Sequence, residues 1–413
     1  MARRVVLAAA LLVVVLVPLP VLASDAPPRP PACHGSGCRG LPTSTLQWAD
    51  NLGGTWAAGT GPATTGDGGT VPAVGQAYVA VGSDVVVLGA GLSLTGYTLS
   101  AGKRLWQTAL DEPAGTAIVS VRAWPGVVTA GLLAPDGRSR TEVVIDTHTG
   151  RVLRRYPAGV FGGAVAASMT TTVVVGRAEV TSYDNATGRV RWQRTIAANQ
   201  PWQTDGPALY LAQSSGGELS SSPVTALKVI NLDTGTERVL SSPLGQPFSG
   251  TLALAADGAL LFASAAGVSA YSESTGAALW GPMPGAVPEG SDPVTGLIYV
   301  TSADGALTGV DPLSGTALTS VPGTTAGSMY VVRNGVAFGL NSGANGTAWG
   351  YNLAKGKVTW TSAPLPWPHF FSDLSGLGGS AAASGDMVVV TACPHVAAVP
   401  GICADPELVA FNV

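Results

Sequence analysis

A short motif recurs seven times along this chain, and its spacing restricts the fold to a repeat architecture. Each copy carries Tyr, Ile or Val, then Asp, Asn, Ser or Thr, and four residues later a glycine. Successive glycines stand 38 to 48 residues apart, which is the length of one four-stranded blade of a β-propeller. The copies cover residues 97–106, 145–154, 183–192, 230–239, 271–280, 310–319 and 351–360.

Each position of the motif has a structural explanation. The short polar side chain can accept hydrogen bonds from the backbone amides of a turn, and the glycine supplies the positive φ that closes a tight hairpin. Four copies place a tryptophan four residues after the glycine, and we predict that it packs between neighbouring blades, with ligand stacking as the alternative. The repeat residues are Gly102, Trp106, Gly150, Gly188, Trp192, Gly235, Gly276, Trp280, Gly315, Gly356 and Trp360.

The two ends of the chain each carry half of a motif. Residues 407–413 begin a copy with Phe411 and Asn412, and residues 45–52 are similar to the half that carries the tryptophan. The N-terminal strand is therefore expected to pair into the last blade and close the ring, which removes exposed sheet edges. We predict an all-β fold, a single propeller of four-stranded antiparallel blades over 44–413, with eight blades as first choice and seven as second.

The composition limits the classes of partner. Only 11% of the residues are charged and the formal net charge is −4, against about 25% charged residues in typical domains. No run of Lys or Arg follows the first few residues, so nucleic-acid binding, which needs a basic footprint, is not expected. We expect a monomer.

The N-terminus is typical of an exported protein. Arg3 and Arg4 precede an apolar run over 5–22 that contains two prolines and ends in small residues. These features predict a signal peptide over 1–24; an uncleaved anchor is the alternative, and would be the only membrane contact. Residues 25–43 are predicted to form a Pro/Gly-rich flexible segment. The protein is expected outside the cell or on the outer side of the cytoplasmic membrane.

Four cysteines form two pairs that are close in sequence. They are Cys33, Cys38, Cys393 and Cys403. An even number of cysteines in an exported chain predicts disulfides. Zinc is the alternative because His34 and His395 lie beside the pairs, although neither spacing has the CxxC form of structural zinc sites.

The repeated pattern [YD]-x-x-[ST]-G-x-x-x-W resembles the PQQ-type propeller repeat of quinoprotein dehydrogenases and of BamB-like outer-membrane assembly proteins. The resemblance covers residues 44–413 and implies the propeller fold. It also raises a PQQ-dependent dehydrogenase as the alternative function, with PQQ and calcium as cofactors. The chain lacks the adjacent cysteines of those enzymes and an evident oxygen-rich calcium cluster. It also lacks GxSxG, HExxH and phosphate-binding motifs. We therefore favour a non-catalytic scaffold without a cofactor, which binds an unidentified protein or cell-envelope ligand.

Propeller geometry places the binding surface. The repeat glycines mark the turns between the third and fourth strands of each blade, so the connections between blades and between the second and third strands lie on the opposite face. Those connections include 199–207, 281–293 and 362–379. The candidate binding residues there are Trp367, His369, Phe370, Phe371 and Trp202. Aromatic side chains are common interface anchors; the alternative is that they plug the propeller mouth.

Overall fold

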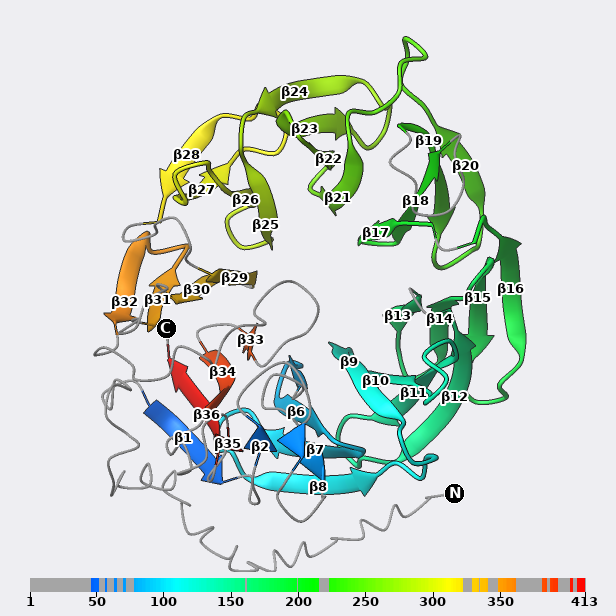
Figure 1. Ribbon diagram of the computed structural model, residues 1–413, viewed down its shortest axis with the longest axis vertical. Coiled ribbons are helices and arrows are strands. Elements are labelled where there is room, and N and C mark those ends of the chain that lie inside the picture. The colour runs from blue at the N-terminus through cyan, green and yellow to red at the C-terminus, as the bar shows by residue number, and fades with distance from the viewer. Residues whose placement is uncertain are drawn as a thin grey trace, which may run out of the picture.

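A computed structural model shows a ring of small β-sheets around a central axis (Figure 1). Every regular element among the described residues is a β-strand. The described residues are 46–51, 56–57, 63–64, 70–71, 78–159, 162–198, 200–214, 223–321, 329–333, 335–340, 348–361, 381–384, 387–392, 402–403 and 407–412.

Seven sheets are each built from four strands that follow one another in sequence, and we number these blades 1 to 7. Blade 1 is β5 (Tyr78–Val81), β6 (Val85–Ala90), β7 (Ser93–Thr98) and β8 (Arg104–Ala109); blade 2 is β9 (Ala117–Trp124), β10 (Val127–Leu133), β11 (Arg140–Asp146) and β12 (Val152–Ala158); blade 3 is β13 (Gly163–Ala167), β14 (Thr171–Val175), β15 (Glu179–Asp184) and β16 (Val190–Thr195). Blade 4 is β17 (Trp202–Asp205), β18 (Ala208–Ser214), β19 (Val224–Asn231) and β20 (Glu237–Leu240); blade 5 is β21 (Thr251–Ala256), β22 (Ala259–Ser264), β23 (Gly267–Ser272) and β24 (Ala278–Met283). Blade 6 is β25 (Val287–Asp292), β26 (Leu297–Thr301), β27 (Leu307–Val310) and β28 (Ala317–Ser320); blade 7 is β29 (Met329–Arg333), β30 (Val336–Leu340), β31 (Ala348–Asn352) and β32 (Lys357–Thr361).

One further four-stranded sheet joins the two ends of the chain. Its order is β1–β36–β34–β33, formed by β33 (Ala381–Ser384), β34 (Met387–Ala392), β36 (Glu407–Asn412) and β1 (Leu46–Asn51). β1 runs antiparallel to β36, with Leu46 opposite Phe411 and Asn51 opposite Glu407. In the described residues the four-stranded sheets thus number eight: seven blades that are continuous in sequence, and the split one predicted from the two half-motifs. Two short pairs stand apart: β2 (Trp56–Ala57) with β35 (Ile402–Cys403), and β3 (Ala63–Thr64) with β4 (Thr70–Val71).

The core lies between the blades. Strand β6 is buried over Val85–Gly89 without alternation, because a middle strand is covered on both faces by neighbouring blades, which favours continuous β-branched runs. One apolar cluster joins Leu94 of blade 1 to Val128 of blade 2. Another joins Leu227 of blade 4 to Phe262 of blade 5. Each blade therefore buries its side chains against the next one, which makes closure of the ring necessary for a complete core.

Two segments differ from the sequence-based expectation. Residues 281–293 were expected to form a connection, yet they contain the innermost strand of blade 6, β25. Pro288 fits there because an innermost strand pairs on one side only, so an amide can be lost without breaking the sheet. Trp202 is likewise the first residue of an inner strand, β17, and not part of a free loop.

The predicted N-terminal segments, 1–24 and 25–43, lie outside the described residues. In the described part of the chain no helix has the length and apolar character needed to span a membrane.

Candidate functional site

The seven repeat turns have one geometry. Each repeat glycine has a φ between 61° and 73°, the left-handed region in which glycine avoids the Cβ clash. The short polar residue before the turn accepts backbone amides. Asp311 Oδ1 accepts the amides of Leu313 and Ser314 at 3.1 and 2.7 Å. The pKa of this carboxyl is lowered, chiefly by the Ser314 amide hydrogen bond, so the turn aspartates have a structural role.

The motif tryptophans contact the repeat glycine of the following blade. A Cβ on Gly150 would lie 2.5 Å from Trp106, and one on Gly315 would lie 2.7 Å from Trp280. The indole N–H of Trp106 donates to the carbonyl of Thr147 at 2.8 Å. Trp192 packs on Gly235 in the same way. This is the inter-blade packing that we expect for these tryptophans; the side chain of Trp360 lies outside the described set.

A second inter-blade column, six residues after the glycine, was not recognised in the sequence. Thr108 Oγ1 donates to the carbonyl of Gly150 at 2.6 Å, and Arg194 Nε donates to the carbonyl of Gly235 at the same distance. The side-chain types differ between copies, so sequence similarity alone carries no signal for this column. The constant distance of six residues from the repeat glycine is the only sequence signal for this column.

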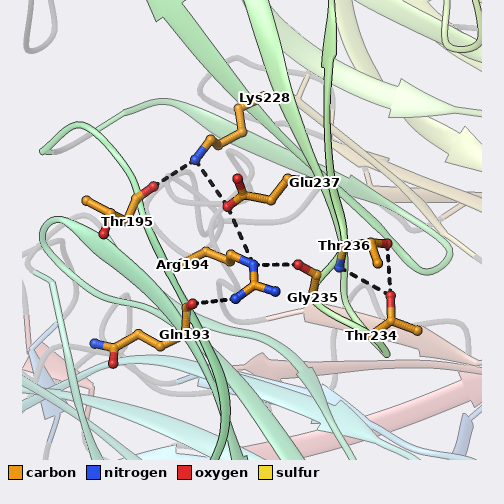
Figure 2. Close-up of polar contacts among 8 residues, drawn as sticks. All are labelled: Gln193, Arg194, Thr195, Lys228, Thr234, Gly235, Thr236 and Glu237. Carbon is orange, nitrogen blue, oxygen red and sulfur yellow. Dashed lines mark hydrogen bonds and ion pairs between the residues drawn. The ribbon is translucent and has the colours of Figure 1, made fainter.

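Arg194 also belongs to a polar network that ties blade 3 to blade 4 (Figure 2). Glu237 Oε1 lies 3.7 Å from Arg194 Nε and 3.1 Å from Lys228 Nζ. Lys228 Nζ further donates to the carbonyl of Thr195 at 2.8 Å. These charges are partly exposed, and such pairs stabilise a protein by only about 0–1 kcal/mol each. The network therefore aligns two blades more than it stabilises the fold.

A cation and an indole meet at the inner strands of three consecutive blades. Arg122 of β9 donates to the carbonyl of Ala164 in β13 at 2.9 Å. Its Cζ lies 5.5 Å from the ring centroid of Trp202 in β17, within the range of a cation–π contact. Both side chains are half-buried. The contact fixes a predicted binding residue, Trp202, near the axis of the ring.

Carboxyl groups gather where blade 4 meets blade 5. Glu273, in the repeat turn of blade 5, interacts with Asp205 and with the buried Tyr210 of blade 4. Burial first, and then the charge of Asp205, raise the pKa of Glu273 to about 7. Burial also raises the pKa of Asp257, on the turn between β21 and β22, with Asp205 adding to the effect. Ionisation of these carboxyl groups places negative charges close together in a partly buried region, which is unfavourable.

Comparison with known families decides the identity of the fold. The family model described as outer membrane protein assembly factor BamB matches residues 45–194 and 210–398, which is most of the chain. The chain belongs to the BamB family of PQQ-type propellers. No curated protein matches it.

Solved structures resemble this BamB-family chain in fold. The computationally designed protein Ika8 is 15% identical, with 82% of this chain and 97% of that chain covered and a TM-score of 0.51. The quinohemoprotein alcohol dehydrogenase of Comamonas testosteroni is 14% identical, with 89% and 76% covered and a TM-score of 0.50. BamB of Moraxella catarrhalis is 21% identical, with 70% and 82% covered and a TM-score of 0.40.

The other predicted site residues of this BamB-family chain are not described. Trp367, His369, Phe370 and Phe371 fall in 362–380, outside the described residues, as do Cys33, Cys38 and Cys393. The backbone of Cys403 lies in β35, opposite Trp56, and its side chain is outside the described set. Their predicted roles in binding, and in disulfides, stay predictions.

Calcium, which assists PQQ chemistry in quinoprotein dehydrogenases, binds sets of carboxylate and carbonyl oxygens. No group of three or more His, Cys, Asp or Glu side chains positioned to hold a metal occurs in the described ranges. We derive no chemical step through these cofactors.

Proposed function

We propose that this chain is an exported, non-catalytic propeller that serves as a binding scaffold for a protein or ligand of the cell envelope. The BamB family membership supports a propeller of the cell envelope. The binding face would be the one opposite the repeat turns, where the connections between blades lie.

The contrast between the two faces carries this proposal. On the repeat face, the turn between the third and fourth strands has five residues in blades 1 to 5, six in blade 6 and four in blade 7. On the opposite face, the described connections between blades range from three residues, 284–286, to ten, 241–250. Variable loops on a rigid scaffold are the usual place for recognition. The uniform turns are used for holding blades together.

The inner end of this face already has an anchored aromatic residue. Trp202 begins an inner strand and is held by Arg122 from blade 2. Trp and Arg are enriched among the residues that dominate binding energies at interfaces. Holding the indole in one place lowers the entropy lost on binding.

Site-directed photo-crosslinking in the native host tests the choice of face. A crosslinking residue at Arg138, exposed in the connection between β10 and β11, is compared with one at Ala186, exposed in the repeat turn of blade 3. We expect a discrete adduct from position 138 that is lost when Trp202→Ala is added, and none from position 186. An adduct from position 186 alone, or none from either position, contradicts the proposal.

The enzyme alternative has a separate test. Purified protein is mixed with PQQ and calcium, and bound quinone absorbance and dye reduction with alcohols or sugars are measured. We expect neither signal. Stoichiometric quinone binding with dye reduction would replace the scaffold proposal by a dehydrogenase.

A further inference from the structure

Exposed cations gather on the outer edge of three consecutive blades. Three of them, Lys103, Arg151 and Arg189, directly precede the outer strands β8, β12 and β16. The other two lie at the start of these strands: Arg104 is the first residue of β8 and Arg191 is the second residue of β16. We call these five residues the cationic arc. Strands β8, β12 and β16 follow one another along the outside of the ring (Figure 1). Each cation lies one to three residues after a repeat glycine, so all five belong to the same end of their blades.

No hydrogen bond or ion pair within the described residues explains the presence of the arc cations. Their side chains form no hydrogen bond or ion pair with any described residue, whereas Arg140, Arg155 and Arg194 in the same blades pair with glutamates. Three anions lie nearby. Asp146 and Asp184 accept backbone amides inside their own turns, and Asp84 lies 3.2 Å from His148. Of the arc residues, Arg191 contributes to the lowered pKa of Asp184 through its charge. The arc therefore keeps an excess of positive charge facing solvent.

Blades 5 and 6 carry no positive charge, whereas blade 4 carries Lys228 and Arg238, and blade 7 carries Lys357 directly after its repeat glycine. Residues 239–332, which include all of blades 5 and 6, contain six acidic residues and no Lys or Arg. Charges on outer strands commonly serve to prevent edge-to-edge association. Positive and negative charges can both serve that role. It therefore does not explain why three neighbouring blades carry exposed cations while two other blades carry no Lys or Arg.

Apolar side chains are exposed among these cations. Leu105 follows Arg104 and is 42% exposed, and Val190 stands between Arg189 and Arg191 and is 53% exposed. Alternation of basic and aliphatic side chains on an open surface suits the boundary between lipid headgroups and acyl chains. Anionic headgroups attract each nearby Lys or Arg.

We propose that the cationic arc docks the outer edge of the propeller against an anionic lipid surface. The cations are spread over three outer strands, and mobile headgroups can adjust to their spacing. A folded acidic protein would need fixed charges that match it. This contact orients the ring on a membrane, is separate from the proposed loop-face binding, and needs no anchor at the N-terminus.

Vesicle sedimentation with paired charge variants tests the proposal on the full chain. Arg104→Gln with Arg191→Gln removes two charges from the arc. Arg138→Gln with Arg177→Gln removes two exposed charges from connections on the opposite face and serves as the matched control. Vesicles of phosphatidylcholine alone are compared with vesicles that also contain phosphatidylglycerol, and the N-terminal segment is the same in every sample.

The expected result is a preference of the unaltered protein for the anionic vesicles that is lost at high salt. The arc variant should lose about tenfold or more in partitioning onto anionic vesicles, since each cation near such a surface contributes about fivefold. The control variant should lose less than about twofold on that basis. All three proteins should melt alike because the altered side chains are exposed.

Three outcomes would overturn the proposal. Equal losses in the two variants would show that net charge alone matters. The absence of any preference for anionic vesicles would exclude a lipid partner. Binding to polyglutamate without binding to anionic vesicles would identify an acidic polypeptide as the partner in place of lipid.

Discussion

The carboxyl pair at the junction of blades 4 and 5 makes the stability of this protein depend on pH in a defined window. Glu273 is partly buried against Asp205 and Tyr210, and its pKa is raised from 4.5 to about 7. The folded state thus holds a proton that the unfolded chain releases at lower pH. The contribution of Glu273 to the free energy of unfolding is fully present below about pH 4.5. It is lost as pH rises through the folded pKa of about 7.

The size of the effect follows from the shift. A shift from 4.5 to about 7 corresponds to an upper bound of about 3–4 kcal/mol at about 1.4 kcal/mol per pKa unit. Burial contributes most of this shift, and the charge of Asp205 adds to it. For a chain of 413 residues, an unfolding entropy of about 2.1 cal/mol/K per residue converts this bound into about 3–4 °C in melting temperature.

Glu273→Gln removes the titrating group and keeps the shape of the side chain. The amide oxygen can still accept from Tyr210, and the amide nitrogen can donate to Asp205. We expect the melting temperature of the variant to vary less between pH 5 and pH 8 than that of the unaltered protein, and to equal or exceed it at pH 8.

Glu179→Gln is the matched control, because Glu179 on β15 bonds to Gln193 and not to a second carboxylate. It should leave the pH dependence unchanged. The reasoning is refuted if Glu273→Gln and the unaltered protein lose the same stability over this window.

Two further predictions concern the repeat turns and the aromatic loop. Gly150→Ala should destabilise more than Gly137→Ala in thermal melts. Both glycines have positive φ, so each substitution costs about 1–2 kcal/mol, but only a Cβ at position 150 meets Trp106, which adds about 1–3 kcal/mol of overpacking; equal losses would contradict this packing role. Trp367→Ala with Phe370→Ala should weaken the loop-face crosslink and leave the melting temperature nearly unchanged, and a large fall in melting temperature would show that these rings belong to the core.

Local features of the chain determined much of this fold. The glycine with positive φ, the turn acceptor four residues before it and the tryptophan four residues after it can be read directly, because each acts through neighbours close in sequence or at a constant repeat spacing. The half-motifs also predicted that β1 would pair with β36. The inner strand β25 was missed because its proline and glycine residues are typical of loops, whereas an innermost strand tolerates them.

Only the tertiary structure decided which side chains meet across blades. Arg122 and Trp202 lie two blades apart, and Glu273 reaches Asp205 from the following blade. Arg122, Trp202 and Asp205 lie outside the repeat motif. Glu273 lies within it, but the motif does not indicate which residue Glu273 contacts. These contacts form because each blade packs against the next one in the ring. The packing brings together positions that are distant in sequence. The residue types at these positions vary between blades, although the backbone conformation is the same in each.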